Sequence, residues 1–190
     1  MPNLGRTVIA FALFSLSASS SLAIAQLANS DAKLQVDYQE RIKKYVELHK
    51  NAAKDAPPIK ETKDAAAIKT AQDALAAKIR ELRPNARQGE IFTPEVAKLV
   101  RKLMAPQVTG PQGAETKEAM KEDAPPRKAI PVKVNARYPD EQPLPTMPPS
   151  LLANLPKLPE ELEYRIVGKD LILRDVPANL IVDFIPAAIR

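Results

Sequence analysis

Residues 162–186 read LEYRIVGKDLILRDVPANLIVDFIP, and this stretch decides the fold of the chain. Two segments rich in aliphatic and aromatic residues, 164–167 and 171–174, flank the pair Gly168-Lys169. A glycine followed by one other residue is typical of the type II′ turn that closes a two-residue β-hairpin. The sequence therefore predicts that these two segments form a tight antiparallel hairpin.

The hairpin turn sets the register of the two strands. It pairs Tyr164 with Leu173 on an apolar face, and it places Glu163 opposite the oppositely charged Arg174 on the other face. A slip of one residue would destroy both matches, so the register is strongly specified.

A third strand is expected at 180–185, after a short loop. The length of that loop places Val182 opposite Leu173, and Phe184 opposite Leu171, which extends the same apolar face. The sequence thus predicts a three-stranded antiparallel meander with one apolar face. The apolar face of so small a sheet must be covered by another element. The candidate for this cover is the helix expected to begin at Thr93.

Upstream of the meander, apolar residues recur every three or four positions in three segments, which predicts three helices. The first covers 31–55 and the second, rich in Ala, covers 60–83. Their short connection at a pair of prolines favours an antiparallel helical hairpin. The third helix starts with Thr93 as N-cap and Pro94 at its first position, and is expected to end at Ala105-Pro106.

Proline-dense stretches separate these helices from the meander. Residues 106–128 have the composition of a partly disordered linker, with one short helix at 114–123. Residues 130–135 are a candidate fourth strand. Residues 139–159 contain repeated Leu-Pro pairs, for which extended polyproline II with one helical turn at 150–154 is expected.

Together these segments predict an α+β protein. Its parts are an N-terminal helical hairpin, a third helix, a proline-rich connector and a small C-terminal antiparallel β-meander. The expected boundaries are a helical region at 26–105, a linker at 106–128, and a final unit at 129–190 that holds the proline-rich segment and the meander. With 4% aromatic residues and no Trp, the core is expected to be modest.

Residues 1–25 have the pattern of an export signal peptide. Arg6 supplies a positive start, an apolar run follows, and the sequence AIA at 23–25 has the small-x-small pattern that a signal peptidase accepts. Cleavage is therefore expected between Ala25 and Gln26. The apolar run is shorter than the roughly 20 residues that span a bilayer. We expect a periplasmic or extracellular protein whose mature chain has no transmembrane segment.

Three segments carry a resemblance to known proteins: YQER leading to YVELHK at 38–50, GEIFTPEV at 89–96, and the stretch 162–186 quoted above. On these segments the chain resembles a group of uncharacterised exported bacterial proteins that share this C-terminal ending. The resemblance implies export and a common fold, and it implies no activity and no site residues. A second resemblance, limited to 164–184, is to small periplasmic metal-homeostasis proteins.

The sequence lacks the patterns of the common catalytic and metal sites. It contains no Cys, and His49 is its only histidine, which excludes disulfides, thiolate nucleophiles and histidine-rich metal sites. It has neither a G-x-S-x-G turn nor a Gly-rich phosphate-binding loop. We expect a non-enzymatic protein without cofactor or metal, in which His49 lies half covered at a helix edge.

The charges exclude one further class of partner. The 28 Lys and Arg residues alternate along the chain with 23 Asp and Glu residues, without a patch of basic and aromatic side chains. Such a mixed surface is not that of a nucleic-acid-binding protein.

Three carboxylates, Asp170, Asp175 and Asp183, lie at or near the ends of the predicted strands. Turn chemistry explains Asp170 and Asp175, because Asp side chains bond nearby backbone amides. Asp183 is expected in solvent, on the face opposite the core. The alternative hypothesis is that these carboxylates serve a periplasmic small-ligand or divalent-metal-binding module.

A partner-binding patch is expected on that opposite face of the meander. Ile172 and Ile181 are apolar there, and Arg165, Arg174 and Asp183 surround them. Apolar residues ringed by charges mark partner sites, although the proline-rich stretch could instead fold back over them. The leading hypothesis is an interaction or structural protein of the bacterial cell envelope, which contacts an unknown envelope protein or surface through the meander and the Leu-Pro segment.

Overall fold

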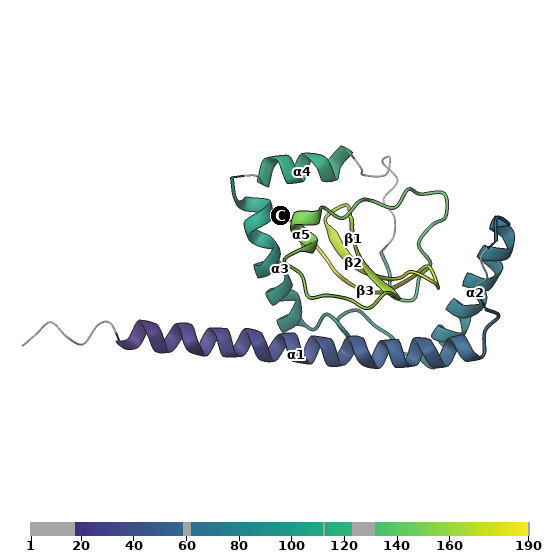
Figure 1. Ribbon diagram of the computed structural model, residues 1–190, viewed down its shortest axis with the longest axis horizontal. Coiled ribbons are helices and arrows are strands. Elements are labelled where there is room, and N and C mark those ends of the chain that lie inside the picture. The colour runs from purple at the N-terminus through teal and green to yellow at the C-terminus, as the bar shows by residue number, and fades with distance from the viewer. Residues whose placement is uncertain (1–17, 59–61, 112, 123–131, 190) are drawn as a thin grey trace, which may run out of the picture. The chain divides into compact units, whose positions relative to one another are not determined.

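The computed structural model describes residues 18–58, 62–111, 113–122 and 132–189 (Figure 1). Most of the expected signal peptide lies outside these ranges. None of the helices within them combines the length and the hydrophobicity that a membrane crossing requires. The elements are α1 (Ala18–Lys54), α2 (Ala65–Leu82), α3 (Pro94–Thr109), α4 (Gly113–Glu122), α5 (Pro149–Leu152), β1 (Leu162–Val167), β2 (Asp170–Asp175) and β3 (Leu180–Ile185).

The chain divides into two units, Met1–Lys33 and Leu34–Arg190. The second unit contains the three-stranded sheet, in the order β1-β2-β3, and most of the helical residues. The expected α+β class is therefore confirmed. Ala25 and Gln26, the expected cleavage site, lie within α1 in the first unit.

The hairpin of β1 and β2 has the predicted register. Tyr164 pairs with Leu173, and Glu163 pairs with Arg174. Gly168 has a φ of 62° at the first turn position, a conformation that glycine adopts without the steric cost of a Cβ. The local sequence was sufficient here because the turn and the pairing patterns agree.

The pairing of β2 with β3 differs from the expectation after its first steps. Arg174 pairs with Ile181 as predicted, but Leu173 then pairs with Asp183 and not with Val182. A β-bulge at this point inserts one extra residue into β3 and turns two consecutive side chains toward the same side. The predicted Phe184–Leu171 pair is consequently also wrong, and Phe184 lies opposite Ile172.

The bulge changes the position of Asp183, which is fully buried and not solvated as expected. Its two carboxylate oxygens accept backbone hydrogen bonds from Gly89 at 2.9 Å and from Ile91 and Phe92 at 2.8 Å each. Ionised carboxylates make strong hydrogen bonds to backbone amides, and buried ones require them. Asp183 therefore fastens the loop before α3 to the sheet.

Helix α1 buries the predicted stripe, including Tyr38, Ile42 and Tyr45. Helix α2 starts later than expected, with Asp64 capping the amides of Ala66 and Ala67. Leu82, the apolar residue at which the helix ends, is 52% exposed.

The two helices do not lie side by side as the expected hairpin implies, because α2 is steeply inclined to the end of α1 in Figure 1. Helix α2 instead bonds to the segment after residue 134: Arg80 donates to the Asn135 carbonyl, and Arg137 donates to Gln72 and Asp73.

Helix α3 starts as predicted, because the Thr93 hydroxyl accepts a hydrogen bond from the Val96 amide and Pro94 follows the cap. Its predicted end is wrong, since the helix continues through Pro106 to Thr109. Proline removes one hydrogen bond, but Val108 beyond it is buried and holds the last turn against the core. Helices α4 and α5 coincide with the two short helical segments expected at 114–123 and 150–154.

The sheet is covered on both faces. A small cluster covers the second face, where Tyr138 packs with Ile172 and Ile181. The main core covers the first face and includes side chains of α1, α3, α5 and all three strands, among them Tyr38, Ile42, Val96, Val100, Met104, Leu151, Tyr164, Leu171, Leu173 and Ile185.

The segment before the Leu-Pro stretch closes the outer edge of β3. The Asn135 amide donates to the Ile181 carbonyl, and the Ile181 amide donates to the Ala136 carbonyl. The described part of the expected fourth strand, 132–135, is not a strand, and a single bridge joins Arg137 to Leu180. Residues 130 and 131 lie outside the described ranges.

We predict that Asp183→Asn lowers the free energy of unfolding by about 2–4 kcal/mol, because the amide group of Asn cannot accept all the hydrogen bonds that Asp183 accepts. The matched control is Asp37→Asn on α1, whose side chain is 45% exposed in its ion pair with Arg41. That change should cost less than about 1 kcal/mol. Urea unfolding measures both values, and equal small losses would contradict the anchoring role of Asp183.

Candidate functional site

The only histidine of the chain meets a buried carboxylate. His49 on α1 places Nδ1 2.6 Å from Oδ2 of Asp175, at the end of β2, and the Tyr45 hydroxyl donates to the same oxygen at 2.8 Å. His49 is 6% exposed and Asp175 is fully buried. The expectation that His49 lies half covered at a helix edge is therefore wrong, because the end of β2 covers it.

The electrostatics of this contact favour a charged imidazole. Burial by itself lowers the pKa of His49, but the hydrogen bond and the charge of Asp175 outweigh burial and raise that pKa above its ordinary 6.5. Burial also raises the pKa of Tyr45 well above 10, so Tyr45 stays a neutral donor. The three side chains thus join α1 to the sheet.

Other carboxylate oxygens of the meander also have donors within the chain. Oδ1 of Asp175 accepts from the Ala178 amide at 2.8 Å, which is the predicted turn chemistry. Oδ1 of Asp170 accepts from the Ala187 amide at 2.8 Å. In the described part of the chain, no group of three or more His, Cys, Asp or Glu residues could hold a metal ion.

The partner patch expected from the sequence is not on the surface. Ile172, Ile181 and Asp183 are fully buried, and Arg174 is 7% exposed. The other expectation, that the proline-rich stretch covers the two isoleucines, is closer to the structure. Tyr138, which directly precedes that stretch, packs against them. Of the five expected contact residues, only Arg165 keeps a partly exposed side chain.

A pocket of about 510 Å³, lined by several charged side chains, lies between α1, the end of α2 and the following loop. Its principal charges are already paired: Arg41 bonds Asp37, and Arg83 bonds Glu90 at 2.6 Å. The Arg83 guanidinium also stacks over the Tyr45 ring, with 5.2 Å between its central carbon and the ring centroid. These two pairs join the elements around the pocket, and Glu40 and Lys44 also line it.

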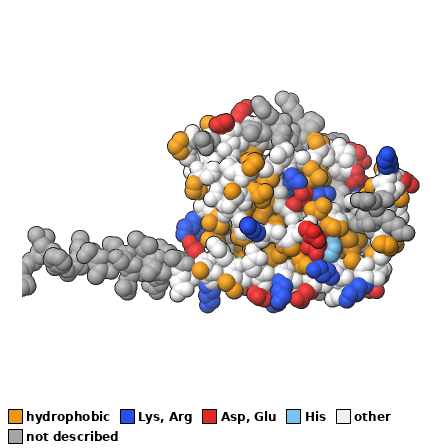
Figure 2. Space-filling view, viewed as in Figure 1, with side chains coloured by type: hydrophobic (Ala, Val, Ile, Leu, Met, Phe, Trp, Pro, Cys, Tyr) orange, Lys and Arg blue, Asp and Glu red, His pale blue; other side chains and the backbone are white. Residues whose placement is uncertain are grey.

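A larger and more apolar cavity lies between the Leu-Pro segment and β1. We call this cavity of about 720 Å³ the Leu-Pro groove. On the face shown in Figure 2, hydrophobic side chains gather over α5 and the adjoining segment. The groove is lined by Thr146, Met147, Pro149, Leu152, Ala153, Leu155, Pro156, Lys157, Leu158, Leu162, Glu163, Tyr164 and Arg165.

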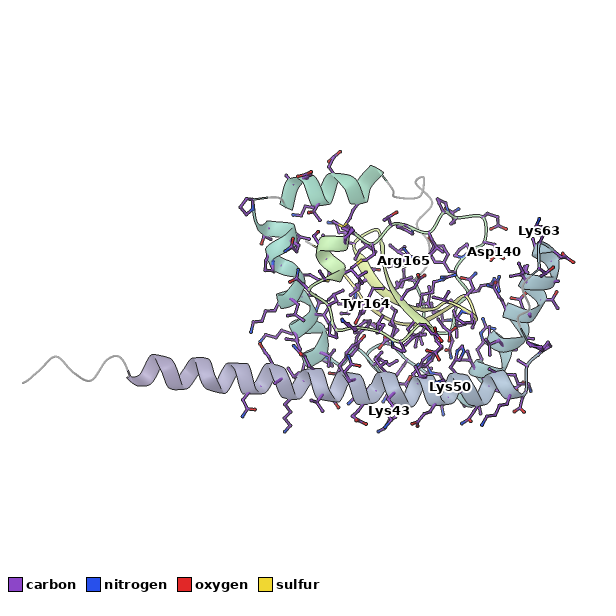
Figure 3. The ribbon with its side chains drawn as sticks, in the orientation of Figure 1. Lys43, Lys50, Lys63, Asp140, Tyr164 and Arg165 are labelled. Atoms are coloured by element: carbon purple, nitrogen blue, oxygen red, sulfur yellow. The ribbon has the colours of Figure 1, made fainter. Side chains whose placement is uncertain are left out.

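Hydrogen bonds hold the walls of the groove in place. The Tyr164 hydroxyl donates to the Pro156 carbonyl at 3.1 Å and bonds the Tyr38 hydroxyl of α1 at 2.8 Å. The Arg165 guanidinium donates to the Pro145 carbonyl at 3.3 Å. Figure 3 shows Tyr164 and Arg165 as neighbours on β1. The groove is thus formed before any ligand arrives, while Leu152 on its wall remains 49% exposed.

The sequence pointed to this groove only in part. Its Leu-Pro pairs singled out one wall, and the strand pattern singled out the other. The two walls are held together by contacts between residues up to 126 positions apart, such as Tyr38 with Tyr164. His49 and Asp175 are separated by the same distance along the chain, so no local pattern could have found their contact.

Comparisons with protein-family models, with curated proteins and with solved structures found no match to this chain.

We predict that His49 stabilises the fold most strongly at low pH. A group whose folded-state pKa is raised contributes fully below its unfolded-state pKa, here about 6.5, and loses this contribution as the pH rises through the folded-state value. The excess unfolding free energy of the wild type over His49→Gln should therefore shrink with rising pH. Because the chain has no other histidine, the comparison isolates this imidazole. A difference that stays constant or grows with pH would contradict the charged pair.

Proposed function

We propose that this chain is an exported, non-enzymatic interaction protein of the bacterial cell envelope, and that the Leu-Pro groove is its contact region. The observation that carries the proposal is the groove itself: a largely apolar cavity with exposed Leu152 on its wall, in a protein whose principal buried charges are paired internally. Apolar concave surfaces of this size are typical binding sites.

The alternative of a periplasmic metal-binding module has less physical support. Asp170, Asp175 and Asp183 each accept hydrogen bonds from the chain's own backbone or side chains. A divalent cation would have to displace these donors from three separate places in the fold. The proposal therefore rests on the groove and not on the carboxylates.

Export is supported by the signal-peptide pattern at residues 1–25 and by the division of the chain into the units Met1–Lys33 and Leu34–Arg190. Cleavage after Ala25 falls in the first unit, before the unit Leu34–Arg190 begins. Among the residues whose side chains the structure describes, the first member of the buried core is Tyr38. Removal of the leader would consequently leave that core complete.

We predict that N-terminal sequencing of the protein recovered from the envelope fraction begins at Gln26. Ala25→Asp should block this cleavage, because the peptidase requires a small residue there. The matched control, Ala28→Asp, places the same charge beyond the cleavage site and should leave processing intact. An intact Met1 on the wild-type protein in the cytosolic fraction would contradict export.

We predict that a photo-crosslinking amino acid in place of Leu152 traps a specific envelope partner in intact cells. The matched control is Leu144, which belongs to the same segment and is 39% exposed but does not line the groove. It should trap little. Equal adducts at both positions, or adducts at neither, would count against the groove as the contact region.

A further inference from the structure

We propose that the Leu-Pro groove takes one hydrocarbon chain of an anionic phospholipid, and that Lys157 at its rim and Lys43 of α1 bind the phosphate. The inference rests on the proposed function, because it names the chemistry of the envelope partner that the groove contacts. Basic side chains beside an apolar surface are typical of proteins that recognise anionic lipids.

The part of the groove that a ligand can reach is its outer wall. The lining residues Met147, Leu155 and Tyr164 are 7%, 5% and 2% exposed, and they close its floor. Leu152 on the wall is 49% exposed, and Leu158 is half-buried. The cavity of about 720 Å³ has the volume of a typical small-molecule site. A thin apolar ligand that lies along the wall therefore fits the groove.

Three backbone carbonyls of the Leu-Pro segment are already used by β1. The carbonyls of Pro145, Pro156 and Pro159 accept hydrogen bonds from the Arg165 guanidinium, the Tyr164 hydroxyl and the Leu162 amide, respectively. Proline has no N–H, so these residues have no backbone donor to offer. A peptide beside them would leave backbone groups of its own unpaired, which costs free energy, whereas a hydrocarbon chain has no such groups. These contacts favour a lipid chain over a peptide.

A second cavity adjoins the groove. It has a volume of about 490 Å³, lies between α1 and the end of the Leu-Pro segment, and shares Lys157 and Leu158 with the groove. We call it the lysine pocket, because it is lined by Lys157 and by Lys43 and Lys50, which both lie on α1 (Figure 3). The Gln39 side chain of α1 donates to the Lys157 carbonyl at 3.2 Å and joins the two walls of the pocket. The apolar groove is thus continuous with a site lined by three lysines.

Two of these lysines have no ion-pair partner among the described residues. Lys50 lies 3.6 Å from Glu161, but no such pair is formed by Lys43 or Lys157 in this part of the chain. Glu47 is the one carboxylate among the residues that line the lysine pocket. The pocket therefore has excess positive charge, and the lysine ammonium is a common ligand of phosphate.

The groove has the same sign of charge as the lysine pocket. Glu163 is the one carboxylate among its lining residues, and it is already shared between Arg165 and Arg174. A ligand with an apolar chain and a negative head complements both cavities. Its chain would contact Leu152 in the groove, and its phosphate would lie at Lys157, where the two cavities join.

As a probe we choose lysophosphatidylglycerol, which has one hydrocarbon chain and one anionic phosphate, at concentrations below micelle formation. Isothermal titration calorimetry with the mature chain should show saturable binding to a single site. The affinity should fall by about tenfold or more in Leu152→Glu, which corresponds to about 1.4 kcal/mol, and by a similar factor in Lys157→Glu. Both side chains are exposed, so these variants should keep the urea midpoint of the wild type.

Two matched variants control for the added charge. Leu144→Glu alters an exposed leucine outside the groove, and Lys98→Glu alters an exposed lysine of α3 outside both cavities. Both variants should bind the probe as the wild type does. Equal losses in Leu144→Glu and Leu152→Glu would overturn the groove as the site of the chain, and equal losses in the two lysine variants would overturn the phosphate contact.

Three further ligands test the two ends of the lipid. Lysophosphatidylcholine of the same chain length should bind more weakly, because the lysines repel its ammonium group, and glycerol phosphate should not saturate the protein because it has no chain. Equal affinity for the two lysophospholipids would overturn the phosphate site. Binding to phosphatidylglycerol vesicles without binding of the monomeric probe would indicate a membrane surface as the ligand and would also overturn the inference.

These outcomes separate the inference from the proposed function. If the photo-crosslinker at position 152 traps a protein in cells and the probe does not bind, the lipid inference is refuted and the interaction function stands. If the probe binds with the expected pattern of variants and nothing is trapped in cells, the lipid chemistry stands and the envelope role is refuted. An adduct with the mass of a phospholipid would support both.

Discussion

The carboxylate of Asp183 is the contact on which the arrangement of this protein depends. It is fully buried in β3 and accepts hydrogen bonds from three amides of the loop that precedes α3. A buried charge is costly unless it is fully hydrogen-bonded, so the loop and the strand require one another. Asp183 thus helps to position α3, whose buried side chains pack in the core over the first sheet face.

A second buried carboxylate ties α1 to the same sheet. Asp175 accepts from Tyr45 and His49 with one oxygen and from the Ala178 amide with the other. Arg83 adds a cation over Tyr45 and reaches the Val182 carbonyl next to the bulge. The small sheet, with few aromatic residues to bury, is therefore held to its helices by polar contacts as well as by apolar packing.

The two edges of the sheet are covered differently. Residues 135–138 close the edge at β3, whereas the Leu-Pro segment runs beside β1 and leaves a groove. Proline lacks the N–H that would pair with the edge, and its fixed φ keeps the segment extended. The Leu-Pro segment is therefore a stiff wall beside β1, and hydrogen bonds from Tyr164 and Arg165 hold it there.

The sequence by itself determined the features that depend on neighbouring residues. Gly168-Lys169 and the alternation around it gave the β1–β2 register, and Thr93-Pro94 gave the start of α3. It failed at the β-bulge beside Val182, at the end of α3 beyond Pro106, and at the surface patch around Ile172. Each of these was decided by packing or hydrogen bonds with residues distant in sequence. The candidate groove follows the same division. Local composition indicated the Leu-Pro segment and the strand separately. Their contact is a tertiary feature, because the Tyr164 hydroxyl of β1 bonds both the Tyr38 hydroxyl of α1 and the Pro156 carbonyl of the Leu-Pro segment.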